Sequence, residues 1–372
     1  MDKPAVAVLF GGRSSEHSIS SATAGGVLRA IDRDSYRVIP VGITRDGVFV
    51  LEDDDPDKFA LDAQRLPEVV DNGTRVLWPE VGDRELRVRR ADGTVEELGA
   101  LDVVLPILHG VHGEDGTIQG FFDTLEIPYA GGGVLDSALC MDKHFMKIVL
   151  QAAGVPVSPW VTVTLERWER DPDGVRADAA ALGEPCFVKP ARAGSSVGVS
   201  KVHAASELDA ALALAFAEDD KVLIESAIVG REVEVAILEG RGGGAPRASL
   251  PGEIVLTTRE FYDFEGKYLG GDGAEVVCPA ELSDSEISAI QELGIRAFQA
   301  VDGKGLARVD FFLSADGLYV NELNTMPGFT PISMFPKCWI ASGLSYPELI
   351  AELIDTALER AARTTAAASS AR

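Results

Sequence analysis

Hydrophobic and polar positions alternate along the segment 306–314 (LARVDFFLS), near the C-terminal end of the chain. Arg308 and Asp310 take alternate positions, and Val309 and Phe311 follow each of them directly. Successive side chains of a strand point to opposite faces. The pattern therefore predicts a strand with the arginine and the aspartate on one face and apolar residues on the other.

A turn and a returning strand follow directly. Residues 314–317 (SADG) are typical of a tight turn, and Glu322 and Asn324 then share one face of the next strand. Antiparallel pairing would set Asp310 roughly opposite Glu322. Two buried carboxylates repel each other unless a cation lies between them, and such hard oxygen ligands suit Mg²⁺. The alternative is an amphipathic hairpin with a solvated acidic face, but the apolar neighbours and the turn at 324–328 favour a metal-nucleotide site.

Apolar runs and helical periodicity predict the other elements, which indicate an α/β protein with α+β elements. The acidic, turn-rich segment 52–99 is expected to be a surface elaboration with a hairpin near 91–93. The predicted strands are 5–10, 36–43, 101–108, 161–165, 186–190, 221–228, 231–238 and 248–256. One predicted helix begins near Ser20 or Ser21, and the others span 134–153, 206–219, 283–301 and 346–362.

Composition narrows the class of protein. With 372 residues the chain is long enough for about two or three domains without disulfides or a structural metal. Its net charge of −25 would repel nucleic acid and anionic membranes, so any phosphate site must be locally basic. The apolar run at 5–10 is too short for a signal peptide and no segment approaches the length of a membrane span, so we expect a cytoplasmic location.

The four cysteines, Cys140, Cys186, Cys278 and Cys338, are scattered along the chain. There is no Cys-x-x-Cys pair and no histidine at ligand spacing, which argues against a zinc site and against a disulfide framework. We interpret them as reduced thiols of the core.

Two glycine loops follow predicted strands. In the first, Glu16 lies just beyond the end of the first strand of an open α/β sheet, where it could hold an ammonium group or be an exposed loop acid. This loop lacks the full Gly-x-Gly-x-x-Gly spacing, and no acid ends the second strand, which argues against a nicotinamide dehydrogenase. In the second loop, His109 could face a substrate or be a structural histidine, and the structural role is favoured.

Phosphate chemistry is suggested by the run 186–198 (CFVKPARAGSSVG). Lys189 and Arg192 supply positive charge, and the glycines and serines around Ser195 and Ser196 let backbone N–H groups point at phosphate oxygens. The Gly-Lys-Ser/Thr ending of a Walker A loop is absent, so a mobile lid over phosphates is expected.

Two further candidates come from a linker and a long loop. Glu225 and Glu232 flank the linker after the strand at 221–228, where they could accept hydrogen bonds from adenine and ribose or be ordinary surface acids. The loop 257–278 is long, aromatic and rich in glycine, which is typical of a functional loop, and its chemical candidates are Lys267 and Tyr268.

Seven motifs, taken in order, resemble the ATP-grasp superfamily and, within it, the D-alanine:D-alanine ligases of peptidoglycan synthesis. They are FGGRSSEHSIS, HGVHGEDGTIQG, MDKHFMK, FVKPARAGSSVGVSKV, FYDFEGKY, GLARVDFF and NELNTMPGFTPIS, and they cover nearly the whole chain. The resemblance implies an ATP-grasp fold with ATP held between two sheets. Its expected parts are an N-terminal open, Rossmann-like α/β domain at 1–137, a central subdomain with the phosphate lid at 138–226, a C-terminal subdomain at 227–362 and a disordered tail at 363–372.

The resemblance also assigns roles to residues. Those expected around ATP are Lys143, Lys189 and Lys267 at the phosphates, the Ser195–Ser196 lid, Glu225 and Glu232 at adenine and ribose, and backbone groups near Ser226 and Ile228 at the base edge. Asp310, Glu322 and Asn324 would bind two Mg²⁺ ions, with Mn²⁺ as a substitute. Glu16 would hold the ammonium of the first D-alanine. Arg308, Gly328 and Ser333 would hold the carboxylate of the second and the developing oxyanion, and Tyr268 with Ser195 would assist the amine.

The implied reaction joins two D-alanines through an acyl phosphate, with ADP and phosphate as the other products. The nearest alternatives are ligases that make D-alanyl-D-lactate or D-alanyl-D-serine, and Tyr268 is the feature that favours an amine as second substrate. A non-catalytic ATP-binding regulator would not need Arg308, Asp310, Glu322 and Asn324 together. A homodimer is expected from the resemblance alone.

Overall fold

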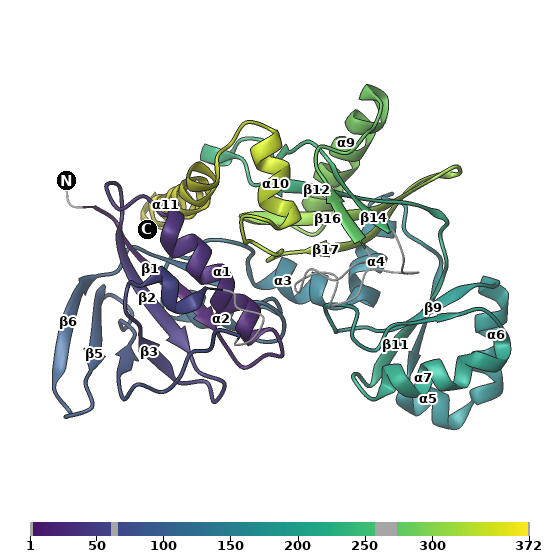
Figure 1. Cartoon of the computed structure of the whole chain (residues 1–372), viewed down its shortest axis with the longest axis horizontal. Coiled ribbons are helices and arrows are strands. Elements are labelled where there is room, and N and C mark those ends of the chain that lie inside the picture. The colour runs from purple at the N-terminus through teal and green to yellow at the C-terminus, as the bar shows by residue number, and fades with distance from the viewer. Residues whose placement is uncertain (1–2, 61–65, 257–273, 371–372) are drawn as a thin grey trace.

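The computed structural model of the chain describes residues 3–60, 66–256 and 274–370. Its strands form three larger sheets and one small one within these ranges, and Figure 1 shows them as three neighbouring bodies. The strands of each larger sheet come from a single one of the three predicted segments. None of the helices in the described ranges is both long and apolar enough to cross a membrane.

The N-terminal sheet has the strand order β3-β2-β1-β7. Its central strand β1 (Ala5–Gly11) is buried along its whole length and pairs in parallel with β2 (Arg37–Ile43) and β7 (Val103–Ile107). Helix α1 (His17–Ala30) begins a few residues earlier than predicted, directly after the glycine loop. The carboxyl ends of the parallel strands therefore meet at the edge where Glu16 lies.

A small antiparallel sheet projects from this body and contains the predicted hairpin. Strand β5 (Glu85–Arg89) pairs with β6 (Val95–Ala100) across a turn in which the Arg90 amide donates to the Thr94 carbonyl. The remaining strands of the N-terminal region are β3 (Phe49–Leu51) and β4 (Arg75–Leu77), and its second helix is α2 (Thr117–Thr124).

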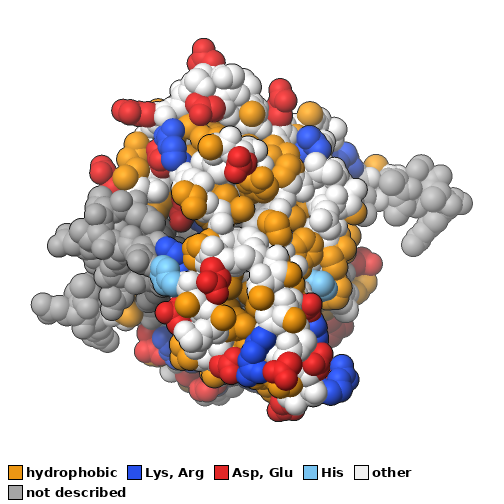
Figure 2. Space-filling model, turned by 90° about the vertical axis from the view of Figure 1, so that its right-hand side faces the viewer, with side chains coloured by type: hydrophobic (Ala, Val, Ile, Leu, Met, Phe, Trp, Pro, Cys, Tyr) orange, Lys and Arg blue, Asp and Glu red, His pale blue; other side chains and the backbone are white. Residues whose placement is uncertain are grey.

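The central sheet has the order β10-β9-β11-β8, with helices covering its outer face (Figure 1). The polar stretch after β8, for which no element was predicted, forms two helices that are N-capped by Thr164 and Asp171. On this side of the molecule basic side chains lie beside acidic ones (Figure 2). The elements are β8 (Trp160–Thr164), α5 (Leu165–Arg170), α6 (Pro172–Leu182), β9 (Cys186–Pro190), β10 (Ser200–Val202), α7 (Leu208–Phe216) and β11 (Lys221–Ser226).

The C-terminal sheet has the order β15-β14-β12-β16-β17, with β13 beside β12. The predicted hairpin is confirmed: β16 and β17 pair with Asp310 opposite Glu322, and a bulge follows Asp310. The predicted capping box of α9 at Ser283 and Glu286 is also confirmed. The elements are β12 (Gly230–Leu238), β13 (Arg247–Ala248), β14 (Gly252–Leu256), β15 (Ala274–Val277), α9 (Asp284–Ala300), β16 (Leu306–Ser314) and β17 (Gly317–Asn324).

The single helix predicted at 134–153 is instead two helices. α3 (Val134–Met141) ends at Asp142, whose carboxylate caps the first turn of α4 (Lys143–Ala152). Met146 and Leu150 of α4 pack in the core beneath the C-terminal sheet. The first residues of the segment predicted as the central subdomain therefore pack with the C-terminal subdomain, because the apolar face of α4 is buried against the C-terminal sheet.

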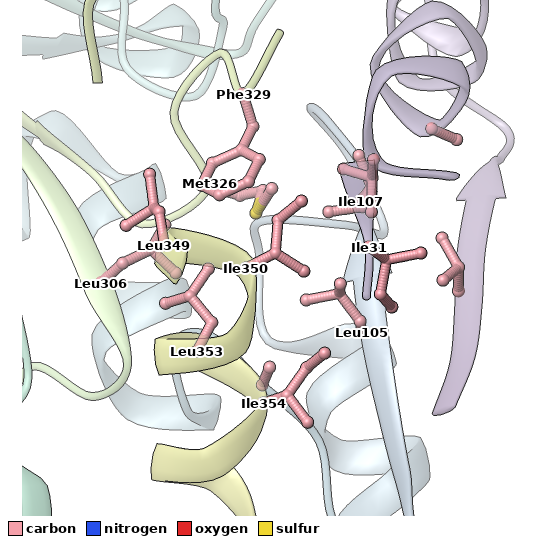
Figure 3. Packing of buried hydrophobic residues seen from close by; sticks show 14 of the residues in the cluster. Ile31, Leu105, Ile107, Leu306, Met326, Phe329, Leu349, Ile350, Leu353 and Ile354 are labelled. Carbon is pink, nitrogen blue, oxygen red and sulfur yellow. The ribbon is translucent and has the colours of Figure 1, made fainter. Parts of the chain in front are cut away.

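The C-terminal helix joins the first and last parts of the chain. Ile350 and Ile354 of α11 (Tyr346–Ser370) point towards Leu105 and Ile107 in one buried cluster (Figure 3). The shorter α10 (Met334–Ala341) packs in the same cluster. This packing fixes the N-terminal sheet against the end of the chain.

The predicted disordered tail is wrong over most of its length, since α11 continues to Ser370 rather than ending at 362. Alanines favour helix, and the Thr364 and Thr365 hydroxyls donate to carbonyls one turn back. Arg363 also lies 3.7 Å from the Glu239 carboxylate. Local propensity and this ion pair extend a helix that the hydrophobic pattern alone would have ended earlier.

Candidate active site

One cavity of about 1170 Å³ lies where the three larger bodies meet. Arg192, predicted to supply charge to the phosphates, does not line it, because its guanidinium pairs with Asp219 and Asp220 instead. The other predicted site residues that the structure describes do line it. Those residues are Glu16, Lys143, Lys189, Ser195, Ser196, Glu225, Ser226, Ile228, Glu232, Arg308, Asp310, Glu322, Asn324, Gly328 and Ser333. Lys267 and Tyr268 fall outside the described residues, so the expectations for them remain predictions.

The wall formed by the C-terminal sheet carries an arginine between two acids. The Arg308 guanidinium donates two hydrogen bonds of 2.7 Å to the Asp310 carboxylate and lies 2.8 Å from Glu234. Burial alone would lower the pKa of Arg308, but the Asp310 and Glu234 carboxylates outweigh burial and raise it. We call Arg308, Asp310 and Glu234 the acid-rich cluster, because two carboxylates share one fixed cation.

The oxygens beside this cluster fit a hard divalent cation. Asp310 and Glu322 face each other across the hairpin, and the Asn324 amide lies 3.0 Å from Asp310. Lys143 lies 3.5 Å from Glu322. The described residues contain no group of three or more His, Cys, Asp and Glu arranged as a complete metal site. Two carboxylates and one amide match Mg²⁺, which commonly takes its other ligands from phosphates and water.

A second cluster, on β9, β11 and α4, has one acid between two lysines, and of its members Glu225 and Lys189 line the cavity. Lys189 lies 2.7 Å from one Glu225 oxygen, and Lys147 lies 3.3 Å from the other. Lys147 is fully buried and also donates to Ser158 at 2.8 Å. Burial raises the pKa of Glu225, but the two ammonium groups outweigh it and the pKa is lowered. We call Lys147, Lys189 and Glu225 the base-rich cluster.

The segment predicted to be a lid lines the cavity, and two of its residues have an unusual backbone geometry. Ser195 and Ser196 have φ values of 51° and 59°, in the left-handed region that side chains other than glycine rarely adopt. The Ser195 hydroxyl donates to Glu16 at 2.6 Å. This hydrogen bond joins the lid to the loop after β1, although the two are far apart in the sequence.

Two more ionisable groups, His109 and Glu114, lie near Glu16. The His109 ring contacts the Met326 carbonyl through Nδ1 at 3.1 Å, while its buried Nε2 has no partner among the described residues. Burial lowers the pKa of His109. Burial and the Glu16 charge raise the pKa of Glu114 to about 8. His109 therefore lines the cavity, whereas a purely structural role was favoured from the sequence.

The floor of the cavity is formed where β17 leads into α10. The Ser333 hydroxyl lies at the start of α10, 2.7 Å from the Thr330 hydroxyl. A Cβ atom at Gly328 would lie 3.1 Å from the Ser333 hydroxyl oxygen. Glycine at this position thus keeps the approach to Ser333 open.

Two charged residues were not predicted from the sequence: Glu234, which lines the cavity, and Lys147, which pairs with Glu225 of its lining. Glu234 could have been found, because it alternates with Glu232 on β12 and so shares its face. Lys147 lies one helical turn after Lys143, and this spacing could have suggested it. Nothing in the sequence shows, however, that Lys147 of α4 reaches Glu225 of β11.

Ser226, whose backbone was predicted to lie at the base edge, lines the cavity, but two of its groups already have partners. Its hydroxyl donates to the Leu182 carbonyl and its amide donates to the Pro159 carbonyl. These two groups are therefore used within the protein.

Comparison with known proteins agrees with this geometry. The family model of the D-ala D-ala ligase N-terminus matches residues 5–132, and that of the D-ala D-ala ligase C-terminus matches 149–355. A D-alanine--D-alanine ligase from Arthrobacter sp. (strain FB24) is 54% identical over 96% of this chain and 95% of its own length. The chain belongs to the D-alanine–D-alanine ligase family.

More distant members of this ligase family agree as well. The ligase of that name from Streptomyces griseus is 47% identical over 96% of this chain and 93% of its own length. The solved D-alanine-D-alanine ligase from Coxiella burnetii superposes with a TM-score of 0.82 at 35% identity, covering 99% of this chain and 98% of that one. The VanG D-Ala:D-Ser ligase from Enterococcus faecalis superposes with a TM-score of 0.78 at 33% identity, covering 95% of this chain and 99% of that one. The chain has the ATP-grasp fold of this ligase family.

Proposed function

We propose that this protein joins two molecules of D-alanine into D-alanyl-D-alanine at the expense of ATP, as a step of cell-wall precursor synthesis. The observation that carries the proposal is one cavity lined both by members of the base-rich cluster and by the acid-rich cluster. Base attracts the phosphates of a nucleotide, and the acids attract the cation that accompanies them. This arrangement suits the transfer of a phosphoryl group to a carboxylate.

The nucleotide would lie between the central and C-terminal sheets. Lys189 and Lys143 would contact its phosphates, and backbone N–H groups near Ser195 and Ser196 would cover them. Ionised Glu225 accepts hydrogen bonds but cannot donate them, so it favours the amino group of adenine over the carbonyl that guanine carries at the same position.

Asp310, Glu322 and Asn324 would hold divalent cations, for which Mg²⁺ is the best match and Mn²⁺ a substitute. A cation held by these residues would supply positive charge to offset the charge that develops on the transferring phosphoryl group.

The first step activates a carboxylate. Glu16, at the end of β1, would hold the ammonium group of the first D-alanine, and one carboxylate oxygen would attack the γ-phosphorus. The products are an acyl phosphate and ADP. Positioning and charge neutralisation provide most of the acceleration in such a step, and the lid keeps out water that would hydrolyse the acyl phosphate.

The second step forms the amide. The amine of the second D-alanine attacks the acyl carbon and loses a proton, and phosphate leaves with the bridging oxygen. Arg308 and the Gly328 amide would stabilise the oxyanion of the tetrahedral intermediate, and Ser333 would hold the second carboxylate. Ser195 and Tyr268 are our candidates for assisting the amine.

Two sister activities differ only at the second substrate. A ligase that accepts D-serine or D-lactate would use the same ATP site and the same acyl phosphate. We expect a cytoplasmic, homodimeric enzyme, because ATP and D-alanine are intracellular metabolites and the resemblance implies dimers.

The test is release of phosphate from ATP with Mg²⁺ and D-alanine, with the product identified by its mass. We expect D-alanyl-D-alanine, with D-serine and D-lactate poorer as second substrates and L-alanine inactive. Phosphate release that does not require D-alanine, or a preference for D-lactate, would contradict the proposal.

A further inference from the structure

Two of the four cysteines meet in the structure although they lie far apart in the sequence. The sulfur atoms of Cys278 and Cys338 are 3.6 Å apart and share an S–H···S contact. No disulfide joins them. Cys278 directly follows β15, and Cys338 lies in α10. The sequence interpretation of the cysteines as scattered core thiols missed this pair, because pairing of β14 with β15 brings Cys278 to α10.

The two thiols differ in the way that a reactive cysteine and its resolving partner differ. Cys278 is partly exposed, whereas Cys338 is fully buried. The contact with Cys338 lowers the pKa of the Cys278 thiol, and Lys337 acts in the same direction. A partly exposed thiol with a lowered pKa, placed beside a second thiol, is the arrangement in which oxidation ends at a disulfide rather than at a higher acid.

The pair lies directly behind a wall of the cavity. Val276, two residues before Cys278, and Lys337, next to Cys338, both line the cavity. A bond between the two sulfurs would tie the end of β15 to the helix that begins after Ser333. The pair therefore lies where a covalent change would reach the site, yet neither cysteine lines the cavity itself.

We propose that Cys278 and Cys338 are an oxidation site of the folded protein, at which a peroxide closes a reversible disulfide. The Cys278 thiolate attacks the peroxide O–O bond, which gives a sulfenic acid and, after proton uptake, water when the oxidant is hydrogen peroxide. The Cys338 thiol then attacks this sulfur and releases a second water. The two thiols together lose two electrons and two protons, and the peroxide is reduced to two molecules of water.

The test treats the native protein with a small excess of hydrogen peroxide at neutral pH, blocks remaining thiols and measures the intact mass and the proteolytic peptides. We expect a loss of two hydrogens, a peptide that joins Cys278 to Cys338, and complete reversal by dithiothreitol. Cys140 and Cys186 are both buried. They should not be oxidised by the peroxide, so their peptides should carry the thiol-blocking group.

Matched variants separate this pair from general thiol oxidation. Cys338→Ala should form no disulfide and should instead accumulate a sulfenic acid at Cys278 that dimedone traps, while Cys140→Ala should behave as the unchanged protein does. If Cys338→Ala does not fold, Cys278→Ser at the partly exposed position replaces it and should likewise form no disulfide. A cross-link that forms only after denaturation, or direct oxidation of Cys278 to sulfinic acid in the unchanged protein, would overturn the proposal.

Discussion

The acid-rich and the base-rich cluster use the same kinds of side chain in opposite proportion. In the first, Arg308 is shared by Asp310 and Glu234, and in the second, Glu225 is shared by Lys147 and Lys189. Each cluster is therefore one charge away from neutral, with opposite sign. Because buried charge is costly unless it is compensated, each cluster favours a ligand of the opposite charge.

The difference explains how a protein with a net charge of −25 can bind a polyanion. The base is concentrated in one cluster, where two lysines exceed one acid, and it is shielded from solvent rather than spread over the surface. The excess acid in the other cluster would be offset by a divalent cation. A nucleotide that carries such cations complements both clusters at once, whereas the nucleotide alone or the cations alone would complement only one.

The largest effect is expected from Arg308→Lys. This change keeps the charge but loses the planar group that holds Asp310 with two hydrogen bonds, so we expect a fall in kcat of about 10²–10³-fold, as for loss of an oxyanion donor. Steady-state kinetics measure it. Arg231→Lys is the matched control, because Arg231 pairs in the same two-pronged way with Glu253 on the same sheet but does not line the cavity. Equal losses in both variants would contradict a special role for the acid-rich cluster.

A smaller effect is expected from Lys147→Met, which makes the base-rich cluster neutral. Glu225 would keep only Lys189, so we expect KM for ATP to rise about tenfold, as for loss of about 1.4 kcal/mol of binding, with little change in kcat. Discrimination against GTP should also weaken, because Glu225 is held less firmly. Lys221→Met is the control, since Lys221 pairs with Asp142 and neither residue lines the cavity. A fall in kcat with KM unchanged would show that the lysine acts on the chemistry instead.

The pH dependence of KM sharpens the same comparison. Burial lowers the pKa of Lys147 to about 8, so the side chain is charged below that pH and neutral above it. We expect KM for ATP to rise as the pH passes through about 8 and to stay flat over the same range in Lys147→Met. The sign for stability is opposite: the unfolded lysine binds more protons between pH 8 and its ordinary pKa, so this group makes the folded state relatively more stable as the pH rises there. An identical pH profile in both proteins would exclude Lys147 as the titrating group.

The smallest effect is expected from Glu114→Gln. Because burial and Glu16 raise the pKa of Glu114 to about 8, this carboxyl is largely protonated at neutral pH, and an amide resembles it. Turnover at pH 7 should change little, while activity above pH 8 should be better retained than in the unchanged protein. Rate measurements at both pH values test this. A severe loss at pH 7 would show that an ionised Glu114 is needed.

The sequence predicted best what depends on local pattern. Alternation placed Arg308 and Asp310 on one face and set Asp310 opposite Glu322, and the structure confirms that register. The capping box at Ser283 was equally local. What failed depended on competition or distance: Asp142 interrupts an otherwise continuous apolar pattern because it caps α4, and α11 continues because alanine sustains a helix without a hydrophobic stripe.

Long-range pairs could not be predicted in the same way. Lys147 meets Glu225, and Cys278 meets Cys338, only because separate sheets and helices pack together. No spacing along the chain encodes such a meeting. The residues that the family motifs name directly come together in one cavity, whereas Lys147 and Glu234, which hold some of them by ion pairs, were not predicted.

The most direct test of the account follows the oxygen that links the two steps. D-Alanine labelled with ¹⁸O in its carboxylate is incubated with the protein, ATP and Mg²⁺, and the released phosphate is analysed by mass spectrometry. Attack of the carboxylate on the γ-phosphorus predicts one ¹⁸O in each phosphate, because the bridging oxygen leaves with it when the amide forms. Unlabelled phosphate, formed together with the dipeptide, would contradict the acyl phosphate and with it the proposed use of the two clusters.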